Sequence, residues 1–108
     1  MTIPPYVAEA GPDRWVVKHS SGLRGPLRML GFRRFPFSST AEMRPRLPLT
    51  FEQMGVLAGE LRNLGVAFSY GHDWSPSEVV QQLRDDGLFR GSFVEISWNR
   101  TGPELRTL

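Results

Sequence analysis

The 108-residue sequence contains no cysteine. Disulfide bonds, thiolate metal sites and cysteine nucleophiles are therefore excluded, and a metal ion could be held only by His19, His72 and carboxylates. No apolar run approaches the roughly 20 residues that span a bilayer. The first residues also lack the basic start and continuous apolar centre of a signal peptide. We therefore expect an unexported, cytoplasmic protein that has no metal and makes no membrane contact.

Sequence motifs for catalysis and nucleotide binding are also missing. The chain contains neither a G-x-G-x-x-G nor a Walker pattern, and neither a G-x-S-x-G nor an H-E-x-x-H motif. It also shows no helix-turn-helix, zinc finger or basic zipper. These absences argue against an enzyme, without excluding one, and they predict no cofactor.

Lysine is nearly absent, because Lys18 is the sole lysine among thirteen basic residues. The net charge of +2 is unevenly distributed. Residues 1–50 carry eight basic and three acidic residues, a net charge of +5, whereas residues 51–108 carry five and eight, a net charge of −3. A basic half of this kind can steer the chain toward an acidic partner.

Six arginines of the basic half lie close together in the sequence: Arg24, Arg28, Arg33, Arg34, Arg44 and Arg46. They can be solvated strand edges and loops, or they can bind carboxylates of an acidic protein. They can also bind RNA, since Phe32, Phe35 and Phe37 alternate with arginine as stacking aromatic residues would. These three interpretations remain open.

The spacing of Arg33 and Arg34 limits what this segment can bind. In a strand, neighbouring side chains point to opposite faces. The two arginines therefore cannot share one patch unless Gly31 forms a bulge or the arginine pair itself forms a turn. We expect at most two or three of the six arginines to reach one ligand.

Apolar residues at spacings of three and four predict a helix over residues 50–64. Thr50 with Gln53 forms a capping box at its start, and Gly65 ends it. Gly55 and Gly59 lie inside this helix, where each costs about 1 kcal/mol relative to alanine. They permit close approach of another backbone, either within the domain or in a partner or self-association surface.

A second helix is predicted to begin at Ser75 and to end at Gly87. Ser75 with Glu78 forms another capping box, and Pro76 occupies the first helical position. Strands are predicted before and after this helix, at residues 66–70 and 92–98. In the second of these strands, residues 94, 96 and 98 face one side and residues 93, 95 and 97 face the other.

The segment YGHDWS, residues 70–75, joins the first of these strands to the helix. Ligands bind at such junctions in open α/β sheets, and the free N–H groups of a helix start attract anions. His72 and Asp73 offer the imidazole and carboxylate of general acid–base chemistry. The residues His72, Asp73, Trp74 and Ser75 therefore form a candidate ligand or anion site. Alternatively, they only form a turn and start the helix.

Further strands are predicted at residues 14–19 and within residues 27–37, with a turn between them at residues 22–26, whereas the prolines of residues 38–48 indicate a loop. The resulting order, β-β-α-β-α-β, predicts an α+β fold. In this two-layer sandwich, two helices cover one face of a mixed sheet of about four strands. We expect an extended N-terminal segment at 1–12, a single domain at 13–98 and a flexible C-terminal tail at 99–108.

By elimination, the sequence favours a small non-enzymatic binding or regulatory protein of the inhibitor, immunity, antitoxin or adaptor type. Its expected partner is a protein with an acidic surface. Nucleic-acid binding, to RNA in particular, through the arginine-rich segment is the second hypothesis. A small enzyme that uses His72 and Asp73 is the third.

Overall fold

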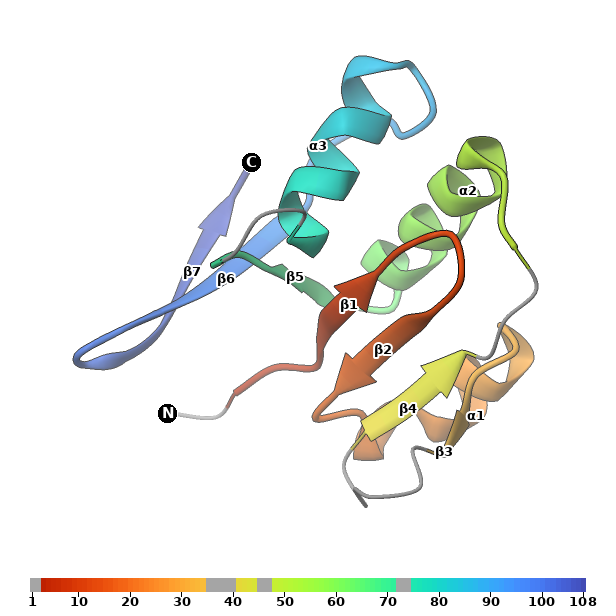
Figure 1. The fold of residues 1–108 in the computed structure, drawn as a ribbon. Helices are drawn as coiled ribbons and strands as arrows, with labels where there is room; N and C mark the ends of the chain where they lie inside the picture. The colour runs from red at the N-terminus through yellow and green to blue at the C-terminus, as the bar shows by residue number, and fades with distance from the viewer. Residues whose placement is uncertain (1–2, 35–40, 45–47, 72–74) are drawn as a thin grey trace.

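A computed structural model of the chain describes residues 3–34, 41–44, 48–71 and 75–108 (Figure 1). The elements in these residues are, in chain order, β1 (Tyr6–Ala10), β2 (Trp15–Lys18), the short 3₁₀ helix η1 (Ser21–Leu23), α1 (Arg24–Met29), β3 (Arg33–Arg34), β4 (Ala41–Arg44), α2 (Phe51–Asn63), β5 (Ala67–Ser69), α3 (Pro76–Asp85), β6 (Val94–Asn99) and β7 (Gly102–Thr107).

The strands form one mixed sheet in the order β3-β4-β2-β1-β5-β6-β7. The central strands β1, β5 and β6 are parallel, and the other pairs are antiparallel. Phe68 of β5 lies opposite Glu95 of β6, so the two strands on either side of α3 are parallel neighbours. The chain therefore crosses from β5 to β6 through α3.

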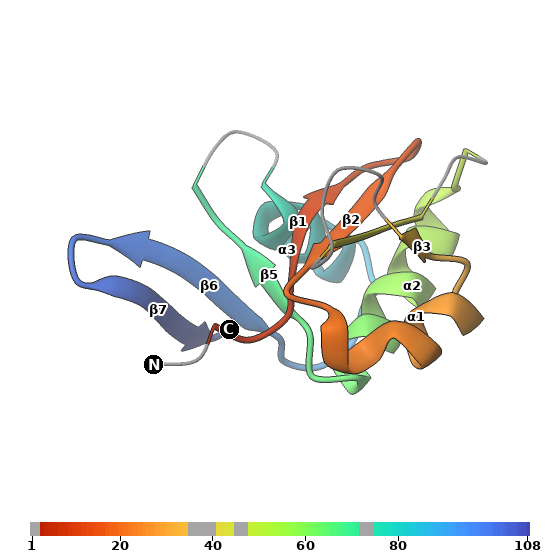
Figure 2. The same ribbon diagram turned by 90° about the horizontal axis from the view of Figure 1, so that it is seen from below.

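The three α-helices of the described residues contribute to one hydrophobic core. Leu27 of α1, Leu61 of α2 and Val80 of α3 are buried in the same cluster as Val17 and Phe68 of the sheet. Figure 2 shows α1 and α2 on the same side of β1 and β2. The predicted two-layer α+β sandwich is thus confirmed, with a longer sheet than the four strands expected and with a third helix. Among the described residues, no helix combines the length and apolar character needed to cross a membrane.

Two positions after its last residue, each described α-helix is followed by a glycine in the left-handed conformation. These residues are Gly31, Gly65 and Gly87, with φ angles of 91°, 84° and 76°. After each glycine, the next N–H donates to the carbonyl five positions earlier, over 2.8 to 3.1 Å. This is the Schellman motif, which satisfies the last carbonyls of a helix. Gly31 therefore ends a helix and does not form the bulge considered from the sequence.

The two longer helices start differently. At α2, the predicted capping box is confirmed: Gln53 N–H donates to Thr50 Oγ1 at 3.1 Å, and Thr50 N–H donates to Gln53 Oε1 at 2.9 Å. At α3, Ser75 makes no side-chain cap bond to the backbone, and its Oγ donates to Glu78 Oε1 at 3.2 Å instead. The predicted capping box at Ser75 is therefore wrong, although Pro76 does open the helix.

The first half of the chain departs most from the prediction. Residues 24–29 form a helix where a turn leading into a strand was expected. Gly25 and Pro26 suggested the turn, but a proline in the first helical turn loses no hydrogen bond, because the N–H groups there have no intrahelical partner. Ala41–Arg44 is a strand inside the predicted loop, and it ends directly before Pro45.

Both predicted terminal segments belong to the sheet, so the domain is larger than residues 13–98. Tyr6–Ala10 pairs with both β2 and β5. Gly102–Thr107 pairs with β6 along its whole length, which corrects the predicted flexible tail. The turn between β6 and β7 is closed by Asn99, whose Oδ1 accepts bonds from Thr101 N at 2.9 Å and Thr101 Oγ1 at 2.7 Å.

Two arginines hold the C-terminal part of the chain in place. Arg84 donates to the carbonyl of Leu108 at 3.0 Å, and its guanidinium lies 5.1 Å from the Phe93 ring centre. Arg62 donates to the carbonyls of Arg90 and Ser92, each at 3.0 Å. These two cations are therefore engaged in internal contacts.

Candidate interaction surfaces

Five of the six candidate arginines lie in described elements, and they are spread over α1, β3 and β4. Arg24 and Arg28 lie in α1, Arg33 and Arg34 form β3, and Arg44 ends β4. Arg46 lies outside the described residues, as do two of the three phenylalanines expected to stack on bases. The third, Phe32, is fully buried in the core, so it cannot stack on RNA.

The predicted alternation of Arg33 and Arg34 is confirmed by the strand register. Through β4, Arg33 aligns with Val16 and Arg34 aligns with Val17. Val17 belongs to the core beneath the helices, whereas Val16 lies on the opposite face. Both arginines are exposed. Arg34 is therefore on the helix-covered side of the sheet and Arg33 on the other side.

On the helix-covered side, α1 and β3 form a basic corner, which consists of Arg28, Met29 and Arg34. β3 lies beside α1 in both views (Figures 1 and 2). Arg28 is exposed in the last turn of α1, and Met29 next to it is 88% exposed. The sequence did not single out Met29, because residues 27–37 were expected to contain a strand.

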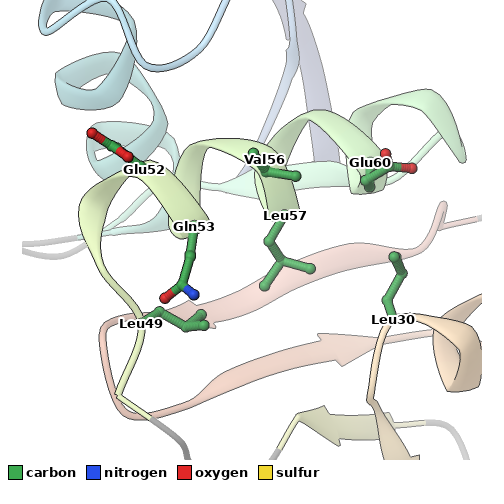
Figure 3. Close-up of a pocket in the computed structure, with 7 residues that line it drawn as sticks. All are labelled: Leu30, Leu49, Glu52, Gln53, Val56, Leu57 and Glu60. Carbon is green, nitrogen blue, oxygen red and sulfur yellow. The ribbon is translucent and has the colours of Figure 1, made fainter.

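A groove of about 420 Å³ continues from this corner between α1 and α2. Figure 3 shows Leu57 and Gln53 of α2 pointing toward Leu30, which follows α1, and toward Leu49. Val56, which is 65% exposed, lies on its rim. The remaining lining residues are the acidic side chains Glu52 and Glu60. The groove is thus apolar at its centre, with acids on the α2 side and the basic corner at the end of α1.

The two helical glycines have different surroundings. A Cβ atom on Gly55 would lie 2.1 Å from the carbonyl oxygen of Leu88, so this glycine permits close packing inside the domain. A Cβ atom on Gly59 would meet nothing within 4 Å. The pair therefore forms no continuous groove for self-association, because Gly55 is already covered by the loop after α3.

Of the candidate ligand site at the start of α3, only Ser75 lies within the described residues. Ser75 is buried and bonded to Glu78, as described above. Close by in the sequence, Ser77 Oγ donates to the buried carboxylate of Glu95 at 2.5 Å. His72, Asp73 and Trp74 lie outside the described residues, and the acid–base hypothesis stays a prediction.

An aromatic cluster lies on the sheet face opposite the helices, and the sequence analysis missed it. The rings of Tyr6 and Trp98 meet edge to face with their centres 5.0 Å apart, and the ring of His19 lies 5.7 Å from Tyr6. Burial raises the pKa of the Tyr6 phenol above its ordinary value of 10.0. Alternation had placed Trp98 with Ile96 on one face, but the local pattern could not predict its pairing with Tyr6.

Within the described residues, no group of three or more histidine and carboxylate side chains is arranged to hold a metal ion. Compared with protein-family models, with curated proteins and with solved structures, the chain shows no significant match.

Proposed function

We propose that the chain is a small non-enzymatic binding protein that acts by contacting another protein through the basic corner and the adjoining groove. An apolar side chain of the partner enters the groove, and acidic groups of the partner pair with Arg28 and Arg34. Arginine suits this role, because its planar guanidinium forms two parallel bonds with one carboxylate.

The exposure of Met29 carries the proposal. This methionine is 88% exposed at the end of α1, directly before Leu30, which lines the groove. Single exposed apolar residues are common on protein surfaces. Here, however, Met29 directly precedes Leu30 of an apolar hollow, and exposed Val56 and the charged side chains Glu52 and Glu60 complete its lining. An apolar centre with a polar rim is the typical arrangement of a protein–protein interface.

The proposal is tested by affinity capture from the source organism after nuclease treatment, with mass spectrometry as the readout. We expect one protein with an acidic surface to be retained by the wild-type chain. Arg28→Glu and Met29→Asp should each lose it, because both introduce a negative charge that repels the acidic surface, and the second also removes the exposed apolar side chain beside the groove.

Arg100→Glu is the matched control, since Arg100 is an exposed arginine in the turn between β6 and β7, at the other end of the molecule (Figure 1). It makes the same charge change as Arg28→Glu and should leave capture unchanged. If both charge reversals weaken capture equally, net charge governs the interaction and the proposed surface is wrong.

A further inference from the structure

The sheet face that no described helix covers, here called the open face, presents an apolar and aromatic surface. The register of β1 and β5 places Tyr6 beside Ala67, on the face opposite the core residue Phe68. On the same face lie Ile96 and Trp98 of β6 and, across from Ile96, Leu105 of β7. Trp98 is 46% exposed and Leu105 is 50% exposed, so large apolar groups remain in contact with water.

The aromatic rings pack over small and buried residues of the sheet. Between β1 and β6, β5 carries only Ala67 and Ser69 on this face, which leaves room for Tyr6 and Trp98 to meet above it. Ile96 is fully buried although no described helix covers it, which we attribute to these rings. Tyr6 and Trp98 therefore form one continuous aromatic surface rather than two isolated side chains.

Basic side chains flank this aromatic surface. Lys18 lies directly across from Tyr6 and is exposed. His19 follows in the left-handed conformation, with a φ of 53°, and its ring packs against Tyr6. Such a conformation is uncommon for a residue other than glycine. Arg33 lies on the same face in β3, which is three strands from Tyr6 of β1.

Few acidic side chains of the described strands lie on the open face. In the described strands, the register places one carboxylate on it, that of Glu9, which pairs with Arg14 at 2.5 Å. Glu95 and Glu104 alternate to the helix-covered side. Most of the other acids lie in or directly after the helices: Glu52, Glu60, Glu78, Asp85 and Asp86. The open face is therefore aromatic and basic, whereas the helical surface is rich in acids.

We propose that the open face binds single-stranded nucleic acid. A base stacks on the exposed face of Trp98 with Tyr6 supporting it, while Lys18, His19 and Arg33 lie along the backbone phosphates. Sequence-tolerant binding to single strands combines these two features, aromatic stacking and a basic track. A duplex offers no exposed base faces for stacking.

This second surface goes beyond the protein contact proposed above and uses none of its residues. The basic corner and groove lie on the helix-covered side, whereas the aromatic cluster lies on the other. One chain could therefore hold a protein and a nucleic-acid strand at the same time, as an adaptor does. Failure of one proposal leaves the other standing, because oligonucleotide affinity and partner capture are separate measurements.

The test is fluorescence anisotropy with labelled single-stranded RNA and DNA of about 12 nucleotides, a length within the known range of site sizes. We expect binding at low salt with a log–log salt slope of about −1.4 to −2.1, since roughly 0.7 is lost per phosphate contact and two or three contacts are available. Trp98→Ala should weaken binding about 5- to 150-fold, the range for losing one base stack.

Three further variants locate the site. Trp98→Phe retains a ring and should restore most of the affinity. Arg33→Glu should weaken binding, whereas Arg34→Glu, one residue away on the other face, should have much less effect. Phe51→Ala is the matched aromatic control, because Phe51 is 69% exposed on the helical side, and it should bind like the wild type.

Several results would overturn the proposal. These are unchanged affinity in folded Trp98→Ala, equal binding of duplex and single strands, and binding of free mononucleotides as tightly as oligonucleotides. Loss of a captured protein in Trp98→Ala, with no oligonucleotide binding at low salt, would assign the face to a protein contact instead. If circular dichroism shows that Trp98→Ala does not fold, the proposal is tested with Lys18→Glu and Arg33→Glu, which change exposed side chains. Unchanged oligonucleotide affinity in both variants refutes the proposal.

Discussion

Replacing each of the two glycines inside α2 by alanine should change stability in opposite directions. Both positions lie in the helix interior, where alanine is favoured over glycine by about 1 kcal/mol. Their surroundings differ, however, because a Cβ atom on Gly59 enters open space and one on Gly55 lies 2.1 Å from the Leu88 carbonyl oxygen. Gly59→Ala should therefore stabilise the fold by about 1 kcal/mol.

The cost at Gly55 follows from the displacement that alanine requires. Bringing the Leu88 oxygen from 2.1 Å to the 3.4 Å of an ordinary contact requires a movement of about 1.3 Å. The oxygen belongs to the backbone and cannot rotate away, and Leu88 N–H is bonded to Leu83 O at 2.8 Å in the motif that ends α3. Overpacking of this kind costs about 1–3 kcal/mol. At the upper end of this range, and after the helical gain, we expect Gly55→Ala to lose about 2 kcal/mol.

Urea unfolding at 25 °C, followed by circular dichroism, measures both variants against the wild type. The two unfolding midpoints should move in opposite directions at unchanged m-value. In thermal scans, Gly59→Ala should raise the melting temperature by about 4–8 °C and Gly55→Ala should lower it by about twice as much. If both variants shift stability by the same amount and sign, the close approach of Leu88 to α2 is wrong.

The two remaining stability predictions concern hydrogen bonds at the helix starts. Thr50→Ala should lower the free energy of unfolding by about 1 kcal/mol, because it removes a side-chain cap. Ser75→Ala should lower it by less than half of that, because Ser75 caps no backbone N–H. Equal losses of the two variants in urea unfolding would contradict this difference. Ser77→Ala should cost about 1–3 kcal/mol by removing the donor to buried Glu95. A double-mutant cycle with Glu95→Ala should show coupling, and additive losses would contradict a direct bond.

The helices that were predicted correctly have strong local signals. In α2, Thr50, Gln53 and Gly65 mark both ends within the segment itself, and the apolar period fills the middle. The short helix α1 lacks these signals, since Gly25 and Pro26 are typical of a turn and six residues are too few to show a period. Its stability comes from tertiary packing, in which Leu27 is fully buried.

The missed strands depend on contacts between segments that are distant in the sequence. β4 is placed between β2 and β3, and β1 joins β5 across more than half of the chain. β7 has mostly exposed side chains, so its sequence shows little of the alternation that indicates a half-buried strand. Its hairpin turn could have been recognised from Asn99, because asparagine commonly bonds to the backbone two residues later.

The candidate surfaces also could be predicted from the sequence only where they do not depend on contacts between distant segments. The opposite orientation of Arg33 and Arg34 follows from strand geometry alone. Which of them faces the helices does not, because that depends on the pairing of β3 with β4 and of β4 with β2. The contact between Tyr6 and Trp98 joins the first and the sixth strands of the chain, and no local pattern predicts it.

The position of Arg33 and Arg34 in β3 also connects the two proposals. One residue apart, they reach opposite sides of the sheet, Arg34 toward the basic corner and Arg33 toward the open face. Reversing either charge changes the net charge of the chain by the same amount. General electrostatic attraction therefore predicts equal effects of both variants on every ligand. Two separate surfaces predict a crossed result, in which Arg34→Glu impairs protein capture and Arg33→Glu impairs oligonucleotide binding, because each ligand contacts only one face.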